Sequence, residues 1–442
     1  GMRRAPAPAL RALRATAATA ARPAALRACT HSYSARRPHP PIRAATIDAD
    51  GALAVQFDVA EGEEGCARWW PAWVDDNAQA AFHPSTRQRT RPVHATRRPL
   101  LLEAAEADAD GACVRVRVCP QGDDAGEAST PPHTHTALLP AAFLWANRPA
   151  AAAAANAADP PHQPWAVADL PGLAPPAFPL AGVLADDALL LSLLTALTRL
   201  GVARLTDCGS EPEVVARVLA RIGFARHTNY GTTFDVRVEP DAVNQAYTDI
   251  ALPLHTDLPF YREPPGVQLL HCICQDAGGG GESLLVDGLS VACAIREESP
   301  ELYHVLTTTP VRFEDGKGRM YAYTYDRCTI EEAQTPQGLQ PRRVFFNNGV
   351  RGSTPFTADR ASLDRLYAAL RMFDDVANRP ALCWQRRLLS GDALMFDNTR
   401  VLHGRTAIAA ARGARWLRGG YVDWDEVRSK ATFLALKAGG AA

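Results

Sequence analysis

The chain has 442 residues and a formal net charge of -1, with 47 Lys and Arg against 48 Asp and Glu, so it is long enough for one large domain with a small companion. The near-zero charge argues against a nucleic-acid-binding protein, which would carry a clustered basic excess, and no apolar run reaches the ~18 residues that a membrane-spanning helix needs. The 10 cysteines are scattered without a CxxC pair, which disfavours a four-cysteine zinc module or a disulfide-stapled secreted domain and favours reduced intracellular thiols.

The N-terminal segment has an unusual composition. Its first 47 residues contain nine arginines among Ala, Ser and Thr, and neither Asp nor Glu. Arg-rich, acid-free, amphipathic segments are typical of mitochondrial transit peptides. An unstructured Ala/Pro tail is the alternative, which the Ala-rich tract at 150–158 makes plausible. Because a bias toward Ala would not exclude acids, we interpret residues 1–45 as a disordered transit peptide and expect the mitochondrial matrix, with the cytoplasm as the alternative.

Residues 46–148 are predicted to form a small β-rich domain. Strand-like segments lie at 52–59 and 114–118, and the segment between them carries Trp69, Trp70 and Trp73. A turn-rich loop at 120–132 follows, and an Ala/Pro-rich linker with little periodicity occupies 149–179. The sequence therefore predicts two folded domains joined by this linker.

Residues 180–435 are predicted to form the larger domain. It begins with helices, and from residue 232 onward the pattern turns to short strands separated by Gly and Pro. The expected elements are helix 186–200, strand 201–205, helix 212–222, strand 267–274, helix 359–378, strand 393–396 and strand 417–422. This order predicts an α+β, mainly β fold in which a double-stranded β-helix (jelly roll) is flanked by helices.

A candidate metal site lies in this domain. His255 and Asp257 are two residues apart in His-Thr-Asp, and His403 follows 146 residues after Asp257. If residues 252–257 form a strand or its end, His255 and Asp257 point to the same face. Two imidazoles and one carboxylate are the ligands that hold non-haem Fe(II) on one side and leave the other side open. On spacing alone, an exposed His/Asp pair and a capping His are an equal alternative.

An ordered set of motifs surrounds these residues, and it closely resembles the γ-butyrobetaine dioxygenase family, whose skeleton the trimethyllysine dioxygenases share. The resemblance covers about residues 46–430. The motifs are AYTDIALPLHTDLPFY at 246–261, PPGVQLLHC at 264–272, GGGESLLVDG at 279–288, FNN at 346–348, FDN at 396–398, HGR at 403–405 and GYVDW at 420–424.

The resemblance implies an Fe(II) site at the three ligands and a 2-oxoglutarate site beside it. It assigns the far carboxylate of 2-oxoglutarate to Arg415, since a guanidinium matches a carboxylate with two parallel hydrogen bonds. Arg412 and Arg418 are nearby alternatives. Ser283 corresponds to a hydroxyl residue that assists co-substrate binding in related enzymes, and an ordinary turn serine is an equal alternative.

The resemblance also implies an aromatic cage for a trimethylammonium group, built from Tyr230, Phe234, Tyr247 and Tyr421. A quaternary ammonium cannot donate hydrogen bonds, so cation–π attraction recognises it. Relatives often carry tryptophan at the position of Phe234, and phenylalanine is the weaker partner. For any single one of these residues, core packing is the alternative.

Two asparagines, Asn244 and Asn347, correspond to residues that hold the substrate carboxylate in the family. An amide donates two hydrogen bonds without adding charge. Loop capping is the alternative for both. Asn244, together with the His-Thr-Asp-Leu-Pro stretch, favours γ-butyrobetaine over trimethyllysine.

The N-terminal domain departs from the family. Relatives carry three closely spaced cysteines after an Asp-Asn pair and a later histidine, which together bind zinc. Here Asp76 and Asn77 are followed by Ala-Gln-Ala-Ala-Phe, and only His83 and His135 are available. Structural zinc needs four ligands. We therefore predict no zinc site and a domain held by packing alone.

The resemblance thus implies an oxygenase that hydroxylates γ-butyrobetaine at C3 to L-carnitine, with Fe(II), 2-oxoglutarate, O2 and ascorbate as reductant. A trimethyllysine dioxygenase is the alternative. Two alternatives belong to other functional classes: a non-catalytic betaine-binding protein and a metal-binding jelly roll of isomerase type. The expected partner is a small trimethylammonium compound, not nucleic acid or a membrane, and relatives imply a homodimer.

Overall fold

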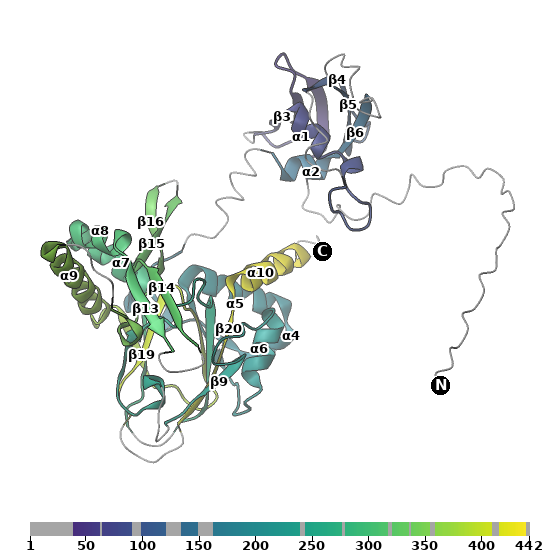
Figure 1. Ribbon diagram of the computed structural model, residues 1–442. Helices are drawn as coiled ribbons and strands as arrows, with labels where there is room; N and C mark the ends of the chain where they lie inside the picture. The colour runs from purple at the N-terminus through teal and green to yellow at the C-terminus, as the bar shows by residue number, and fades with distance from the viewer. Residues whose placement is uncertain are drawn as a thin grey trace, which may run out of the picture. The chain divides into compact units, whose positions relative to one another are not determined.

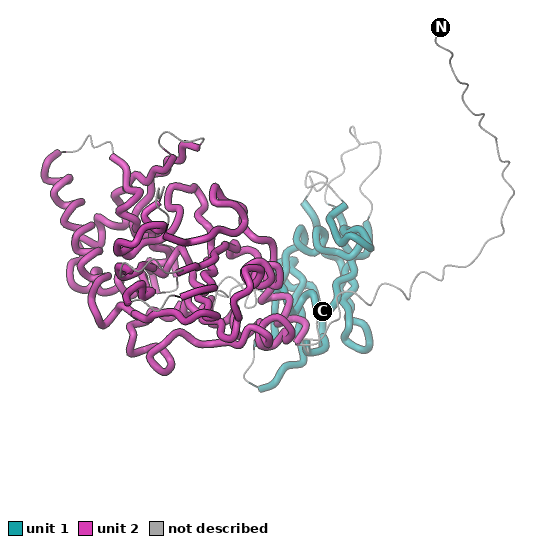
Figure 2. Tube along the Cα trace, turned by 90° about the horizontal axis from the view of Figure 1, so that it is seen from below, with its two compact units in different colours: residues 1–151 teal, residues 152–442 magenta. Residues whose placement is uncertain are grey.

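A computed structural model of the chain describes residues 39–61, 64–90, 99–120, 134–148, 162–238, 244–275, 279–316, 321–335, 337–353, 359–408 and 415–438. The chain divides into two compact units, residues 1–151 and 152–442 (Figure 2). The predicted transit peptide up to residue 38 and the loop at 121–132 lie outside the described residues.

The first unit is built from two three-stranded antiparallel sheets with short helices. One sheet has the order β1-β2-β3 and the other β4-β5-β6. Along β5, Val114, Val116 and Val118 are buried while the arginines between them are exposed, the period-two pattern of a strand with one face on a core. The elements are β1 (Ile42–Ile47), β2 (Leu53–Phe57), β3 (Cys66–Trp69), α1 (Pro71–Asp76), η1 (Gln79–Ala81), β4 (Leu100–Ala107), β5 (Cys113–Pro120), β6 (His135–Pro140) and α2 (Ala141–Ala146).

Two expectations for this unit need correction. The strand β1 starts at Ile42 and pairs with β2, so folded structure begins before the boundary of 45 that we set for the transit peptide. Because β1 pairs with β2 across a turn, the composition of residues 42–47 alone does not show that they form a strand. Packing is also not the whole of what holds the unit together, because His135 Nε2 lies 2.9 Å from the carboxylate of the buried Asp75.

The second unit contains two large sheets that pack against each other. The six-stranded sheet has the order β7-β8-β18-β11-β20-β9, and the four-stranded sheet has the order β10-β19-β12-β17. Leu285 and Trp384 from the small sheet share a buried cluster with Phe396 and Leu417 from the large one. The strands are β7 (Ala177–Pro179), β8 (Val202–Thr206), β9 (Thr233–Val236), β10 (Leu252–His255), β11 (Val267–Cys274), β12 (Ser283–Asp287), β17 (Cys383–Arg386), β18 (Ala393–Asp397), β19 (Val401–Arg405) and β20 (Trp416–Val422).

Helices form two groups around these sheets (Figure 1). The first group packs on the large sheet through a buried cluster that joins its leucines and valines to Leu269 and Met395. It consists of α4 (Leu180–Ala185), α5 (Asp187–Leu200), α6 (Val214–Ile222) and α10 (Trp424–Ala438). The second group lies with two antiparallel strand pairs and consists of α7 (Gly288–Glu298), α8 (Pro300–Thr308), α9 (Arg360–Ala377), β13 (Val311–Asp315) with β14 (Tyr323–Arg327), and β15 (Ile330–Thr335) with β16 (Gly338–Val344). None of the described helices is long and apolar enough to cross a membrane.

The predicted helices at 186–200, 212–222 and 359–378 are present within two residues of their expected ends. The Asp186 carboxylate caps α5 by accepting from Ala188 N, and Gly201 ends it with a left-handed φ of 72°. We expected short strands after residue 232 and did not expect α7, α8 or α10. The helical pattern in their sequences is weak. These helices are stabilised by packing against neighbouring elements.

The predicted linker at 149–179 is correct only in its composition. Residues 149–161 lie outside the described residues, but Trp165 is fully buried and donates from Nε1 to the Leu200 carbonyl at 2.7 Å. The Trp165 backbone N–H donates to Asp287 at 2.9 Å, and the buried Arg400 forms an ion pair with the same carboxylate at 2.8 Å. η3 (Val167–Asp169), η4 (Pro171–Leu173) and β7 follow. The second half of this segment therefore belongs to the larger unit.

Candidate active site

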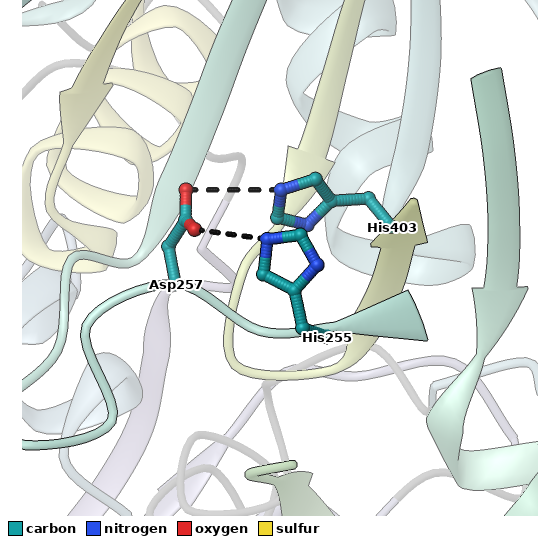
Figure 3. A group of neighbouring side chains, drawn as sticks. All are labelled: His255, Asp257 and His403. Carbon is teal, nitrogen blue, oxygen red and sulfur yellow. Dashed lines mark ion pairs between the residues drawn. The ribbon is translucent and has the colours of Figure 1, made fainter. Parts of the chain in front are cut away.

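Two histidines face each other across the pair β10–β19. His255 at the end of β10 is the register partner of His403 on β19, so both imidazoles project from the same face of the sheet. Their ring centroids are 4.2 Å apart. Asp257 follows just beyond the strand, where Leu258 turns the chain with a positive φ of 55°. The strand thus ends earlier than 257, but the turn still brings Asp257 to the two histidines (Figure 3).

The three side chains have the spacing of a metal site. Asp257 Oδ1 lies 3.3 Å from His255 Nε2, and Oδ2 lies 3.7 Å from His403 Nε2. All three ligand atoms lie within 4.8 Å of one another, and no other group of three His, Cys, Asp or Glu side chains with this property occurs among the described residues. Two imidazoles and one carboxylate on one side of an ion form the facial triad of non-haem iron oxygenases.

Protonation states also fit a metal ion. Burial, assisted by the adjacent His255, lowers the pKa of His403 to about 3, so its imidazole is neutral near pH 7. Burial alone would raise the pKa of Asp257, but His403, His255 and the Tyr421 hydroxyl outweigh it and hold that pKa well below its ordinary range. Neutral imidazole and ionised carboxylate are the forms that coordinate a metal. The residues present therefore fit Fe(II).

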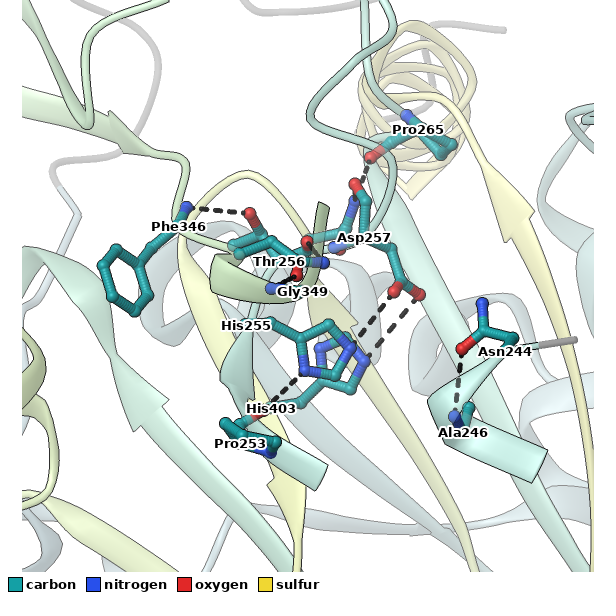
Figure 4. Close-up of polar contacts among 12 residues, drawn as sticks. Asn244, Ala246, Pro253, His255, Thr256, Asp257, Pro265, Phe346, Gly349 and His403 are labelled. Carbon is teal, nitrogen blue, oxygen red and sulfur yellow. Dashed lines mark hydrogen bonds and ion pairs between the residues drawn. The ribbon is translucent and has the colours of Figure 1, made fainter. Parts of the chain in front are cut away.

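Hydrogen bonds fix two of the ligands (Figure 4). His255 Nδ1 lies 2.8 Å from the carbonyl oxygen of Pro253; with Nδ1–H as donor, Nε2 is left to face Asp257. The Asp257 backbone N–H donates to Asn398 Oδ1 at 2.7 Å, and the fully buried Asn398 amide donates back to the Asp257 carbonyl at 3.0 Å. The FDN motif singled out Asn398 in the sequence, but its role in holding the turn after β10 required the structure.

Tyr421 joins the triad to the aromatic residues. Its hydroxyl donates to Asp257 Oδ2 at 2.7 Å, and its ring stacks on Phe234 with centroids 5.3 Å apart. Burial and the Asp257 charge raise the pKa of Tyr421 well above its ordinary value, so the hydroxyl remains a donor. From the sequence we assigned Tyr421 only to the cage. Its contact with a ligand carboxylate 164 residues away is a second role.

The other cage candidates lie beside this pair. Tyr230 and Phe234 have centroids 6.1 Å apart. Burial and then the Asp315 carboxylate raise the pKa of Tyr230 to about 12, and Tyr247 contributes to the same shift. The sequence reading missed Asp315, an anionic neighbour of this aromatic group. The rings of Tyr230, Phe234 and Tyr421 therefore lie together next to the triad, and Tyr247 lies near enough to contribute to the raised pKa of Tyr230 and of Tyr421.

Both asparagines cap short helices, the alternative that the sequence left open. Asn244 Oδ1 accepts from Ala246 N at the start of η5 (Gln245–Tyr247), and Asn347 Oδ1 accepts from Gly349 N at η6 (Asn348–Val350). Their amide nitrogens donate to residues beside the triad: Asn244 donates to the Tyr230 hydroxyl at 3.0 Å, and Asn347 donates to the Thr256 carbonyl at 3.2 Å. Each amide retains a second N–H.

Two arginines near the triad are buried: Arg405 is the last residue of β19, and Arg415 directly precedes β20. Arg415 is 7% exposed and lies against Gly281, whose positive φ of 66° favours glycine. Arg405 is 4% exposed and is the register partner of the buried Ser283 across β12–β19. Burial and then Arg415 lower the pKa of Arg405 to about 10. The two cations are thus near neighbours.

The alternatives to Arg415 are less suited to a carboxylate. Arg418 forms an ion pair with Asp235 at 3.0 Å and also donates to Thr233. Arg412 lies outside the described residues. Ser283 lies at a buried position beside Arg405 rather than in a turn. A carboxylate between Ser283 and Arg415 would meet a hydroxyl and a planar cation.

A protein-family model decides the class of the molecule. The model of the taurine catabolism dioxygenase TauD, TfdA family matches residues 166–421, which include the whole triad. The chain belongs to this family. It is a 2-oxoglutarate-dependent dioxygenase.

Three curated relatives are similar to this chain. A γ-butyrobetaine dioxygenase from Pseudomonas sp. is 40% identical over 263 residues, which cover 60% of this chain and 67% of that protein. The human γ-butyrobetaine dioxygenase is 37% identical over 54% of this chain and 62% of that protein. A trimethyllysine dioxygenase from Neurospora crassa is 29% identical over 59% of this chain and 61% of that protein. The matches thus span about two thirds of the length of these relatives.

Proposed function

We propose that this dioxygenase hydroxylates γ-butyrobetaine at C3 to give L-carnitine. The observation that carries the proposal is the double contact of Tyr421, which stacks on Phe234 at 5.3 Å and donates to Asp257 at 2.7 Å. A trimethylammonium group in the cage is therefore held at a fixed position relative to the metal ligands. The higher identity to the γ-butyrobetaine dioxygenases, 40% and 37% against 29%, favours this substrate over trimethyllysine.

His255, Asp257 and His403 would hold Fe(II), and the two sheets that carry them would form the double-stranded β-helix of the predicted fold. With iron and 2-oxoglutarate bound, O2 supplies one oxygen atom to the substrate C–H bond and one to succinate, with release of CO2; ascorbate keeps the iron reduced. Arg415 and Ser283 would bind the far carboxylate of 2-oxoglutarate. The protein contributes orientation and exclusion of water.

The two ends of the substrate would meet different chemistry. Tyr230, Phe234, Tyr247 and Tyr421 would surround the trimethylammonium group. The free N–H groups of Asn244 and Asn347 would donate to the carboxylate, and neither adds a charge that would need desolvation. Both amides are already oriented by their capping bonds, so little side-chain entropy is lost on binding.

The test is a turnover assay with the purified full chain, Fe(II), ascorbate and 2-oxoglutarate. We expect carnitine from γ-butyrobetaine, and no carnitine from the His255→Ala variant, which should also lose Fe(II) binding. Hydroxylation of trimethyllysine alone would assign the trimethyllysine reaction instead. Binding of γ-butyrobetaine without succinate formation would indicate a non-catalytic betaine-binding protein.

We also propose a mitochondrial location and a homodimer. The support for the location is the Arg-rich, acid-free segment of the first 47 residues, and a related trimethyllysine dioxygenase from rat, 30% identical, is mitochondrial. Import into isolated mitochondria with cleavage near residue 40 would support it, and retention in the cytoplasm would refute it. Light scattering of the purified protein decides the oligomeric state.

A further inference from the structure

Arg405 connects the strand that carries His403 to the segment 244–250, which carries two of the proposed substrate-binding residues. We propose that Arg405 is a positioning residue that fixes this segment against β19 and so sets the place of the substrate relative to the triad. The inference rests on the proposed function, since it takes Asn244 and Tyr247 to contact the substrate. It assigns a role to a residue for which the sequence offered none.

The contacts of Arg405 are directed at one segment. Its guanidinium donates to the carbonyl oxygens of Ala246 at 3.1 Å, Thr248 at 2.7 Å and Ile250 at 2.8 Å. Arg405 is 4% exposed, so little water competes for these bonds. Donors with a positive charge form stronger bonds than neutral ones, and three of them act here on five consecutive residues.

The segment itself has little structure to hold it. Its helix η5 is three residues long, and its remaining backbone bonds are local, such as Tyr247 N to Asn244 O and Thr248 N to Gln245 O. Among the described residues, other ties to the rest of the unit include Ile408 N to Asp249 O at 2.8 Å and the Asn244 amide to Tyr230. A single 3-10 turn is marginal without tertiary contacts. Arg405 therefore supplies much of what orders this segment.

The anchor point makes the effect specific to the substrate. Arg405 is two residues from His403 on the same strand, so the two side chains share a face of the sheet. β19 is paired on both sides, by β10 and β12, and is therefore a rigid reference. Through the carbonyl contacts of Arg405, this strand holds Asn244 and Tyr247 in position. A shift of about 1 Å in a bound substrate can cost a hundredfold in rate.

The chemistry also explains why arginine occupies this position. The three acceptors are carbonyl oxygens of alternate residues, Ala246, Thr248 and Ile250. One side chain can reach all three only if its N–H donors point in different directions. The guanidinium offers five N–H donors in a fixed fork, whereas a lysine ammonium is a point charge on a flexible stem. Arg405→Lys should therefore retain the charge but lose part of the geometry, and Arg405→Met should lose both.

The experiment compares these two variants with Arg379→Lys as a matched control. Arg379 forms an exposed ion pair with Glu298 on α7, away from the triad. The first measurement is hydrogen–deuterium exchange of the amides at 244–250 in the full, metal-free chain. We expect exchange to rise about tenfold or more in both Arg405 variants and to remain unchanged in the control.

The second measurement is turnover. We expect the KM for γ-butyrobetaine to rise about tenfold or more, while the KM for 2-oxoglutarate and Fe(II) binding stay within about twofold. We also expect more succinate per hydroxylated product, because a displaced substrate is oxidised less often than the co-substrate. A general loss of packing would move all of these quantities together.

Three outcomes would overturn the proposal. One is unchanged exchange at 244–250 in folded Arg405 variants. Another is a raised KM for 2-oxoglutarate with an unchanged KM for γ-butyrobetaine, which would place Arg405 in the co-substrate site. The third is failure of both variants to fold while Arg379→Lys folds, which would make Arg405 a general structural residue. If the wild-type chain does not hydroxylate γ-butyrobetaine, the proposed function fails, but the exchange comparison still decides the role of Arg405.

Discussion

Tyr421→Phe separates the two roles of one side chain. It keeps the ring that stacks on Phe234 but removes the hydroxyl that donates to Asp257 Oδ2 at 2.7 Å. Tyr421 is 2% exposed, so water does not replace the lost donor. A hydrogen bond to a charged group is worth about 1.5–3 kcal/mol, which is roughly 10–150-fold in an equilibrium constant. We therefore expect Fe(II) affinity to fall by about 10–100-fold, the range found when partners of metal ligands are removed.

The assay is anaerobic titration of the metal-free protein with Fe(II), followed by measurement of the KM for γ-butyrobetaine at saturating metal. Because the ring remains, that KM should change by less than about threefold. Tyr303→Phe is the matched control, since the Tyr303 hydroxyl donates to the Glu332 carboxylate at 2.9 Å in a different part of the unit. Unchanged Fe(II) affinity in Tyr421→Phe, or an equal loss in both variants, would refute the reasoning.

Three further predictions concern the co-substrate, the cage and pH. Arg415→Met should raise the KM for 2-oxoglutarate by about a hundredfold, since it removes a charged pair, and an unchanged KM would exclude Arg415 from that site. Gly419→Ala places a Cβ 2.5 Å from Phe234 Cζ, so we expect the free energy of unfolding to fall by about 1–3 kcal/mol and betaine affinity to fall with it; thermal melts and calorimetry check both. Hydrogen bonds from Lys437 and Arg221 lower the pKa of Asp187 from 3.8 to about 2. The contribution of Asp187 to stability is therefore present above pH 3.8 and is lost as the pH falls toward 2. Asp187→Asn should flatten this part of the stability–pH curve, and a curve identical to that of the wild type would contradict the assignment.

Local signals in the sequence were sufficient for the helices that carry both a cap and a strong apolar face. The helix α5 shows this best, with Asp186 at one end, Gly201 at the other and buried leucines between them. The triad was also predictable, because His255 and Asp257 lie within one motif. Their convergence with His403 depends on the pairing of β10 with β19, and only the family resemblance indicated it.

Contacts between distant segments could not be predicted in this way. The Tyr421 hydroxyl reaches a carboxylate 164 residues away, and Arg405 reaches carbonyl oxygens 155 or more residues away. A backbone carbonyl has no sequence signature, so nothing marks it as an acceptor for an arginine. Trp165 lies in an Ala/Pro-rich stretch without periodicity, and its burial depends on a space between elements that form elsewhere in the chain.

The anchored Trp165 determines where the larger unit can be cut. A fragment that starts at residue 180, where composition changes, would omit the Trp165 amide that donates to Asp287 and the Gln163 carbonyl that accepts from Arg400 at 2.7 Å. The ion pair of Asp287 and Arg400 is fully buried, so water could replace these two lost hydrogen-bond partners only by entering the core. A fragment that starts at or before His162 would keep them. Protease treatment that trims the chain should therefore stop before His162, and a recombinant dioxygenase unit should begin at or before that residue.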